Sequence, residues 1–214
     1  MSLKKSLVLV ALILIADQLS KIYIKTHFTM NETVEVLSWF KFVFIENSGA
    51  AWGTKLSDFL PISEDTGKLI LTVFRLFAVV GIGYWLYDTV KKKLPKTLAI
   101  AVALIFAGAL GNIIDSVFYG VLFSESVYGG PIATMFSDQP YAGFFHGKVV
   151  DMLHFPFIEN AIWPSWVPYF GGKTFSFFEP VFNIADMAIS TGVGILLVFN
   201  KKAFAKPEKE LAED

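Results

Sequence analysis

Long apolar stretches separated by polar connections are the feature that most limits how this chain can fold. Four stretches, at about residues 6–24, 69–87, 97–114 and 182–199, each approach the roughly 20 residues that a helix needs to cross a bilayer. Only 17% of the 214 residues are charged, whereas soluble domains carry roughly a quarter. The sequence therefore predicts an all-α membrane protein with a bundle of four transmembrane helices, formed by residues 1–214 as one domain.

The first apolar stretch resembles a secretory signal because Lys4 and Lys5 precede it. However, Asp17, Gln18 and Lys21 occupy the place where small cleavage-site residues are expected. We therefore interpret this stretch as a helix that the mature protein retains.

Basic clusters predict which side of the membrane each connection faces. They precede the first stretch, separate the second from the third and follow the fourth: Lys4 and Lys5; Lys91, Lys92, Lys93 and Lys96; Lys201, Lys202, Lys206 and Lys209. Placing all of them in the cytoplasm satisfies the positive-inside rule. We expect both termini and the tail 201–214 inside, and the connections 25–68 and 115–181 outside.

The outer connections are predicted to be ordered. Residues 35–45 are rich in β-branched and aromatic side chains, which predicts one or two strands. The second connection carries many Trp, Tyr and Phe side chains, and we expect it to lie along the outer leaflet.

Two aspartates interrupt apolar sequence. Asp151 follows two valines, and Asp186 lies just inside the last apolar stretch. Because a carboxylate near hydrocarbon is costly, such acids are rare and usually functional. Two carboxyl groups in one low-dielectric site cannot both ionise easily, so one keeps its proton while the other can activate water, as in aspartic proteolysis. The structural alternative is that Asn183 or Asp186 caps the fourth helix.

The other unusual polar residues fall on the same predicted outer face. Asp17 and Lys21 are four residues apart, which predicts an ion pair with a structural role near the interface. Asn47 and Gly49 belong to a small-residue turn, either a plain turn or a loop that contacts substrate.

The end of the third stretch combines small and polar residues. Gly108 and Gly111 have the spacing of close helix packing in membranes. That packing does not explain Asn112 and Asp115, which we expect to orient neighbouring groups.

Several kinds of site are not supported. The chain has no cysteine, its three histidines form no H-E-x-x-H pattern, and no G-x-S-x-G sequence is present. We expect no metal and no cofactor. A net charge of −1 argues against a nucleic-acid partner.

Five short sequence blocks follow one another along the chain: DQLSK at 17–21, ENSGAAWG at 46–53, GALGNIID at 108–115, VVD at 149–151 and FNIAD at 182–186. In this order they resemble the blocks of the lipoprotein signal peptidase (signal peptidase II) family, the membrane aspartic endopeptidases of bacteria. Each block alone is a weak signal, but five in order on a four-span chain are specific.

The resemblance implies a dyad of Asp151 and Asp186. It implies a substrate site formed by Asn47, Gly49, Asn112 and Asn183 and supported by Asp115, Asp17 and Lys21. It also implies a four-helix bundle with a small extracytoplasmic β-rich cradle.

The same resemblance implies the reaction and its setting. The substrates would be prolipoproteins cut on the amino side of a diacylglyceryl-modified cysteine, and globomycin-type inhibitors would block the reaction. The enzyme would act as a monomer among membrane lipids in the bacterial inner membrane, with its active site at the extracytoplasmic face.

Two departures from the family pattern matter. Ser116 stands where the family usually has arginine, so a guanidinium is either missing or replaced, with Lys148 and Lys173 as candidates. The stretches 121–146 and 158–180 are longer than the family needs, and we expect an enlarged flap or lipid-facing rim around the site.

Two other functions remain as alternatives. A proton-coupled transporter or relay could use Asp115, Asp151 and Asp186, although the chain shows no inverted repeat. A structural membrane subunit could use the polar residues to join helices.

Overall fold

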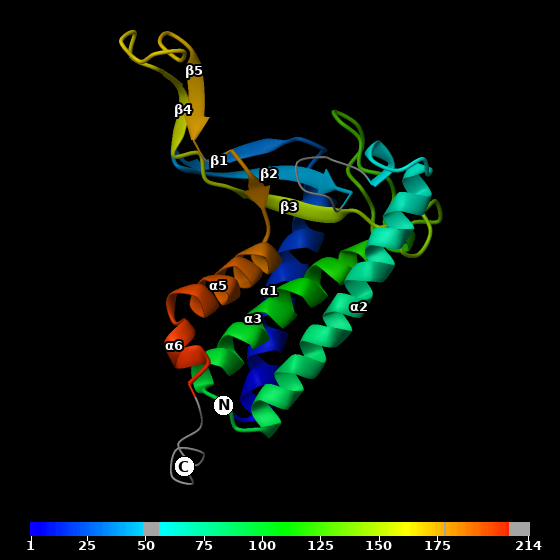
Figure 1. The fold of residues 1–214 in the computed structure, drawn as a ribbon. Coiled ribbons are helices and arrows are strands. Elements are labelled where there is room, and N and C mark those ends of the chain that lie inside the picture. Colours follow the sequence, from blue (N-terminus) through cyan, green and yellow to red (C-terminus); the bar gives the residue numbers. More distant parts are fainter. Residues whose placement is uncertain (49–55, 178, 206–214) are drawn as a thin grey trace.

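A bundle of helices carries a small antiparallel sheet at one end (Figure 1). The computed structural model describes residues 1–48, 56–177 and 179–205. The elements follow in the order α1 (Leu3–His27), β1 (Thr33–Leu37), β2 (Phe40–Asn47), the 3₁₀ turn η2 (Leu56–Asp58), α2 (Glu64–Lys91), α3 (Lys96–Ile114), the π-helical turn η3 (Asp115–Tyr119), α4 (Gly120–Leu122), β3 (Val149–His154), β4 (Ile158–Ile162), β5 (Thr174–Phe177), β6 (Val181–Phe182), α5 (Ile184–Val198) and α6 (Asn200–Ala203).

Within the described residues, three helical stretches are long and apolar enough to cross a membrane: α1, α2 and the continuous stretch Lys96–Leu122. They contain the first three predicted spans. The third continues eight residues beyond the predicted end at 114, because η3 and α4 extend α3.

The fourth predicted span, 182–199, differs from the helix that forms there. Residues Val181–Phe182 pair with β3 as strand β6, so α5 begins at Ile184 and has 15 residues. That length is below the roughly 20 residues of a full crossing. A fourth crossing therefore stays a prediction.

The main sheet has four antiparallel strands in the order β1-β2-β3-β6. The strands predicted within 35–45 are confirmed as parts of β1 and β2. Phe44, Val150 and Met152 from the sheet pack against Ile24 of α1 and Tyr119 beyond α3, and all five are at most 2% exposed. This apolar core fixes the sheet on the end of the bundle.

α3 lies at the centre of the bundle, with α5 and α2 on either side of it (Figure 1). A Cβ atom at Gly108 would lie 2.1 Å from the carbonyl oxygen of Ala185, and one at Gly111 would lie 2.7 Å from Oδ2 of Asp17. The packing role predicted for both glycines is confirmed. Their lack of side chains brings α3 close to α5 and α1.

The start of α1, the connection between α2 and α3, and α6 all lie at the end of the bundle opposite the sheet (Figure 1). The described lysines of the three basic clusters therefore share one end. Which side of the membrane that end faces stays a prediction.

The two long stretches have different structures. Between residues 121 and 146, Phe123 and Ala133 are buried, so this stretch is part of the packed interior rather than only a flap or rim. β4 and β5 pair with each other and project beyond the main sheet, away from the helices (Figure 1). Whether this hairpin serves as a flap or rim stays a prediction.

Candidate active site

Asp151 lies on β3, opposite Ile45 of β2. Side chains alternate along a strand, so Asp151 points away from the core that Val150 and Met152 enter. Asp151 is 5% exposed, and its Oδ1 accepts a hydrogen bond of 2.7 Å from Asn183 Nδ2. The Asn47 side chain also hydrogen-bonds to this carboxyl group.

Asp186 lies in the first turn of α5, where Asn183 is the N-cap. The Asp186 N–H donates to Asn183 Oδ1 at 2.9 Å, and the Asn183 N–H donates to Asp186 Oδ2 at 3.4 Å. This reciprocal pair is a capping box, so the capping alternative is confirmed for this segment. The cap uses only Oδ2 and the N–H of Asp186. Its Oδ1 accepts a further hydrogen bond of 2.8 Å from Asn112 Nδ2.

The fully buried Asn183 links the two aspartates. Its Nδ2 donates to Asp151, and its Oδ1 accepts from the backbone of Asp186. The same Nδ2 also lies 3.2 Å from Asn112 Oδ1 and 3.2 Å from the Val150 carbonyl oxygen. The two aspartates, 35 residues apart in sequence, are thereby brought together around one amide, and the charge of Asp186 acts on Asp151.

Lys21 of α1 fixes the orientation of Asn112. Its Nζ lies 2.9 Å from Asp17 Oδ2, 2.8 Å from Asp115 Oδ2 and 2.9 Å from Asn112 Oδ1. An ammonium group only donates, so Asn112 must turn its oxygen to Lys21 and its NH₂ group to Asp186. The predicted ion pair between Asp17 and Lys21 is confirmed, and both residues are completely buried.

The two acids that pair with Lys21 also hold the backbone beside the two candidate catalytic acids. Asp17 Oδ1 accepts from the N–H of Ala185 at 2.9 Å, directly before Asp186. Asp115 Oδ2 accepts from the N–H of Val150 at 3.3 Å, directly before Asp151. One buried ion cluster therefore positions both elements of the pair.

The electrostatic surroundings of the two aspartates differ. Burial, and then the nearby negative charge of Asp186, raise the pKa of Asp151 to about 7, although Lys21 and the amides of Asn183 and Asn47 act in the opposite direction. Asp186 is only half-buried. Asp151 is therefore still partly protonated at neutral pH, where an ordinary carboxyl group has lost its proton.

Comparison with known proteins identifies the family. Residues 9–201 match the family model described as Signal peptidase (SPase) II. The chain belongs to the signal peptidase II family. A lipoprotein signal peptidase of Porphyromonas gingivalis is 45% identical over 193 residues, which cover 89% of this chain and 80% of that relative. One of Amoebophilus asiaticus is 30% identical over 200 residues, covering 92% and 77%.

A solved structure of a bacterial membrane enzyme also resembles this fold. It has 25% sequence identity and a TM-score of 0.56, and the match covers 96% of this chain and 93% of that one. Membership of the signal peptidase II family implies a peptidase, and with the apolar helices it implies a multi-pass membrane protein of bacteria. The family resemblance of the five sequence blocks is confirmed.

Some predicted residues lie outside this cluster. Gly49 is outside the described residues. Lys148 Nζ lies 3.4 Å from Glu46 Oε2, and Lys173 Nζ lies over the ring of Phe170 in the projecting hairpin. Neither lysine is thus placed as a direct partner of the two aspartates.

Sequence reasoning missed two further groups of polar residues. Gln18 Nε2 donates to Asp115 Oδ1 at 2.9 Å, so it belongs to the ion cluster. Lys25, assigned to an outer connection, is completely buried in α1, where it pairs with Glu46 and donates to Ser126 Oγ at 2.8 Å. A sequence signal for Lys25 exists, since it continues the Asp17–Lys21 helical face by one turn.

A third missed residue is Arg75 of α2. Its guanidinium interacts electrostatically with the carboxylate of Asp186. Its signal was compositional: it is the only arginine in the sequence and stands alone among apolar residues.

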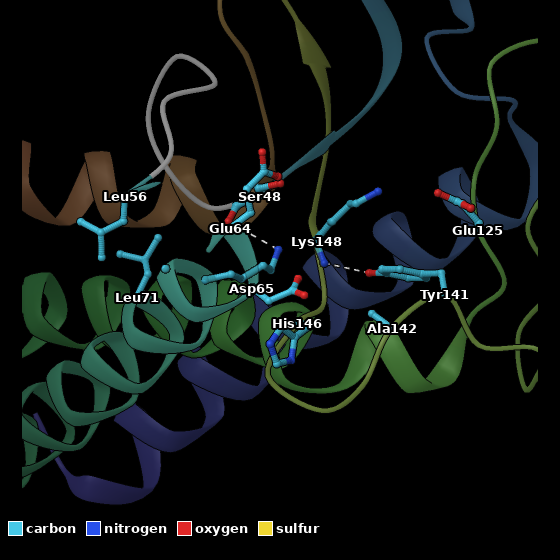
Figure 2. A pocket seen from close by; sticks show the side chains of 12 residues that line it. Ser48, Leu56, Glu64, Asp65, Leu71, Glu125, Tyr141, Ala142, His146 and Lys148 are labelled. Atoms are coloured by element: carbon cyan, nitrogen blue, oxygen red, sulfur yellow. Dashed lines mark hydrogen bonds between the residues drawn. The ribbon is translucent and has the colours of Figure 1, made fainter. Parts of the chain in front are cut away.

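A cleft of about 280 Å³ lies beside the site, between the start of α2, Ser48 and the segment before β3 (Figure 2). Its wall includes Lys68, whose Nζ donates to the Ser48 carbonyl oxygen at 3.4 Å, and the Tyr141 hydroxyl, which accepts from the Lys148 N–H at 2.7 Å. Of the residues predicted for the site, only Lys148, the candidate replacement for the family arginine, lines it, so we place the chemistry at the two aspartates. Among the described residues, no group of three or more His, Cys, Asp or Glu side chains is placed to hold a metal ion.

Proposed function

We propose that this protein is an aspartic endopeptidase that removes signal peptides from prolipoproteins, cutting on the amino side of a diacylglyceryl-modified cysteine. Its family supports action on lipoprotein precursors. The observation that carries the aspartic mechanism is the Asn183 amide, which binds Asp151 through Nδ2 at 2.7 Å and the backbone of Asp186 through Oδ1 at 2.9 Å.

The unequal surroundings of the two acids assign their roles. Ionised Asp186 takes a proton from a water molecule, and the water oxygen attacks the scissile carbonyl carbon. Protonated Asp151 donates to the carbonyl oxygen, where negative charge develops. The proton on Asp186 then passes to the leaving nitrogen as the C–N bond breaks, while the carbonyl re-forms and returns its proton to Asp151.

The remaining predicted residues keep this arrangement in place. Asn112 and Asn183 bind the two carboxyl groups and line the space where the peptide lies, together with Asn47. Lys21, Asp17 and Asp115 act behind them, because their contacts go to these amides and to the backbone of β3 and α5. We assign them support rather than contact with the reacting atoms.

The site lies where the helices meet the sheet, which suits a substrate anchored in the same membrane. We propose four crossings, with both termini in the cytoplasm and the site at the extracytoplasmic face of the inner membrane, where globomycin-type inhibitors would compete with substrate. A lipid chain contributes about 0.8 kcal/mol for each buried CH₂ group. Most of the binding free energy can then come from the diacylglyceryl group.

The test uses the full-length protein in detergent and a fluorescent prolipoprotein peptide with a diacylglyceryl cysteine. We expect Asp151→Asn and Asp186→Asn each to lower the cleavage rate by roughly 100- to 10,000-fold, the usual contribution of acid–base groups. Asp138→Asn, which removes an exposed acid, is the matched control and should cleave as the wild type does.

Folding of each variant is checked by its thermal melting curve. Cleavage at a wild-type rate by either folded site variant would reject the dyad. Equal cleavage of the peptide without its lipid would reject the proposed substrate class.

A further inference from the structure

Arg75 stands out first by composition. The chain has 18 Lys and Arg residues, of which Arg75 is the one arginine. Within α2, it is the only charged residue between Lys68 and Asp88. A charged side chain within a membrane helix is costly and is usually retained for a function.

The neighbours of Arg75 on α2 show which way this part of the helix faces. One turn before it, Thr72 is buried and its Oγ1 donates to the Phe145 carbonyl oxygen at 3.0 Å. One turn after it, Val79 is buried against Ile113. Residues three and four apart share a helix face, so Arg75 starts from the side of α2 that packs on α3.

From that position the half-buried Arg75 acts on Asp186. The two charges attract each other, and Asp186 comes from α5 on the other side of α3 (Figure 1). Asn112, which donates to Asp186 Oδ1, is the residue next to Ile113 on α3. Arg75 therefore approaches Asp186 at the level of the site.

Two other cations close to the pair are already engaged. Lys68 of α2 repels Arg75, and its Nζ donates to the Ser48 carbonyl oxygen at 3.4 Å. Lys21 reaches the site from α1, but its Nζ is bound to Asp17, Asp115 and Asn112. Asp151, which approaches Asp186 from β3, is itself an acid and supplies no positive charge. Among the described residues that act on Asp186, Arg75 is thus the cation that can balance its charge.

The choice of arginine has a chemical reason. A guanidinium group is planar, stays charged and can hold a carboxylate through two parallel hydrogen bonds, whereas an ammonium group acts as a point charge. Every other basic residue besides histidine in this chain is lysine. If this position needed only a positive charge, lysine would serve there as it does at the other basic positions.

We propose that Arg75 is a positioning residue of the hydrolytic site, whose guanidinium supplies a counter-charge to Asp186 and holds its carboxylate in the orientation that receives the proton of water. This inference rests on the proposed function. Asn112 supplies one fixed donor to Asp186, and Arg75 supplies the counter-charge. The combination leaves Asp151 as the acid that retains the proton.

The test compares Arg75→Gln and Arg75→Lys with the wild type in the pH dependence of kcat/KM on the lipidated peptide. Without a counter-charge, a smaller fraction of Asp186 is ionised at a given pH. For Arg75→Gln we expect the acidic limb of the pH profile of kcat/KM to move to a pH about one unit higher. A nearby opposite charge lowers the pKa of a carboxyl group by about 1–3 units, and this variant removes that charge. The decrease in kcat/KM should come mainly from a lower kcat rather than from a higher KM.

Arg75→Lys retains the positive charge, so its acidic limb in the pH profile of kcat/KM should stay within about half a pH unit of the wild type. Its kcat should fall in part, because lysine lacks the planar pair of donors. Lys91→Gln removes a cation from the cytoplasmic end of the same helix and is the matched control, with an unchanged limb. Wild-type limbs and rates in both Arg75 variants would overturn the inference. If Asp186→Asn also cleaves normally, the proposed function itself fails.

A second measurement does not depend on activity. If Arg75 pairs with Asp186, Arg75→Gln should lower the melting temperature of the wild type more than that of Asp186→Asn, in which the carboxylate is already absent. Should Arg75→Gln not accumulate in cells, the pairing predicts that Asp186→Asn restores it. Equal destabilisation in the two backgrounds, or no restoration, contradicts the pairing.

Discussion

The buried carboxyl group of Asp151 predicts a specific dependence of stability on pH. Its pKa rises from 3.8 to about 7 in the folded protein, mainly because of burial and secondly because of Asp186. Between these two values the folded state holds a proton that the unfolded state has lost. The free energy of unfolding therefore falls as the pH rises through this window and stays constant above it.

The magnitude follows from the size of the shift. Each pKa unit corresponds to about 1.4 kcal/mol, so about three units give at most roughly 4 kcal/mol of destabilisation above pH 7. Asp151→Asn removes this titration and keeps an oxygen that can accept from Asn183 Nδ2. For a protein of this size, about 2–4 °C per kcal/mol converts the effect to on the order of 10 °C.

The assay is a thermal melt in detergent, followed by tryptophan fluorescence at pH 5, 6, 7 and 8. We expect the melting temperature of Asp151→Asn, relative to the wild type, to rise from pH 5 to about pH 7 and then to level off. Asp138→Asn, at an exposed loop position, should show no such trend. A difference that stays constant from pH 5 to pH 8, or that falls, would refute the account of Asp151 as a destabilised buried acid.

Three further predictions concern the scaffold and the membrane. Lys21→Met should destabilise the protein by about 3–5 kcal/mol in chemical or thermal unfolding, because it leaves two buried carboxylates unpaired, whereas Lys4→Met at the exposed start of α1 should have little effect. Single cysteines at Lys93 and Lys173, introduced into a chain without native cysteine, should react with an impermeant thiol reagent in intact cells only at the second position. Deletion of residues 158–180 should leave the melting temperature nearly unchanged and raise KM for the lipidated peptide, and an unchanged KM would reject a flap role.

The helices were predictable because their signal is local. An apolar stretch of nearly 20 residues has few alternatives in a membrane, so three of the four stretches mark α1, α2 and α3. Their ends were less predictable, because tertiary contacts decide them. The extension of α3 through η3 is packed against the segment before β3, where the N–H of Gly147 donates to the carbonyl oxygen of Ser116 at 2.9 Å.

The site was predictable in its acids but not in its connections. Asp151 and Asp186 were found because a carboxyl group beside apolar residues is costly. The strand that carries Asp151 was not assigned, because its register depends on pairing with β2, about a hundred residues away. Asn183 shows that capping and site assembly were not alternatives, since one amide performs both with different atoms.

The ionic contacts of Arg75 and Lys25 were not predicted, for a related reason. Neither lies near its acidic partner in sequence, and only the folded chain shows that Arg75 acts on Asp186 and that Lys25 pairs with Glu46. Both could have been suspected from the cost of a cation inside a membrane helix, the argument that found the two aspartates. That argument applies equally to bases and acids, but in the sequence it was applied only to the acids.

The buried cluster around Lys21 links stability to the geometry of the site. Asp17 and Asp115 each use one oxygen for Lys21, and through hydrogen bonds to backbone N–H groups they also hold α5 and β3 directly before the two candidate catalytic acids. A change in this cluster therefore acts on the positions of the two acids as well as on the stability of the bundle. For that reason a weakened cluster should lower cleavage at temperatures well below the melting transition, while changes elsewhere in the apolar core should lower both together.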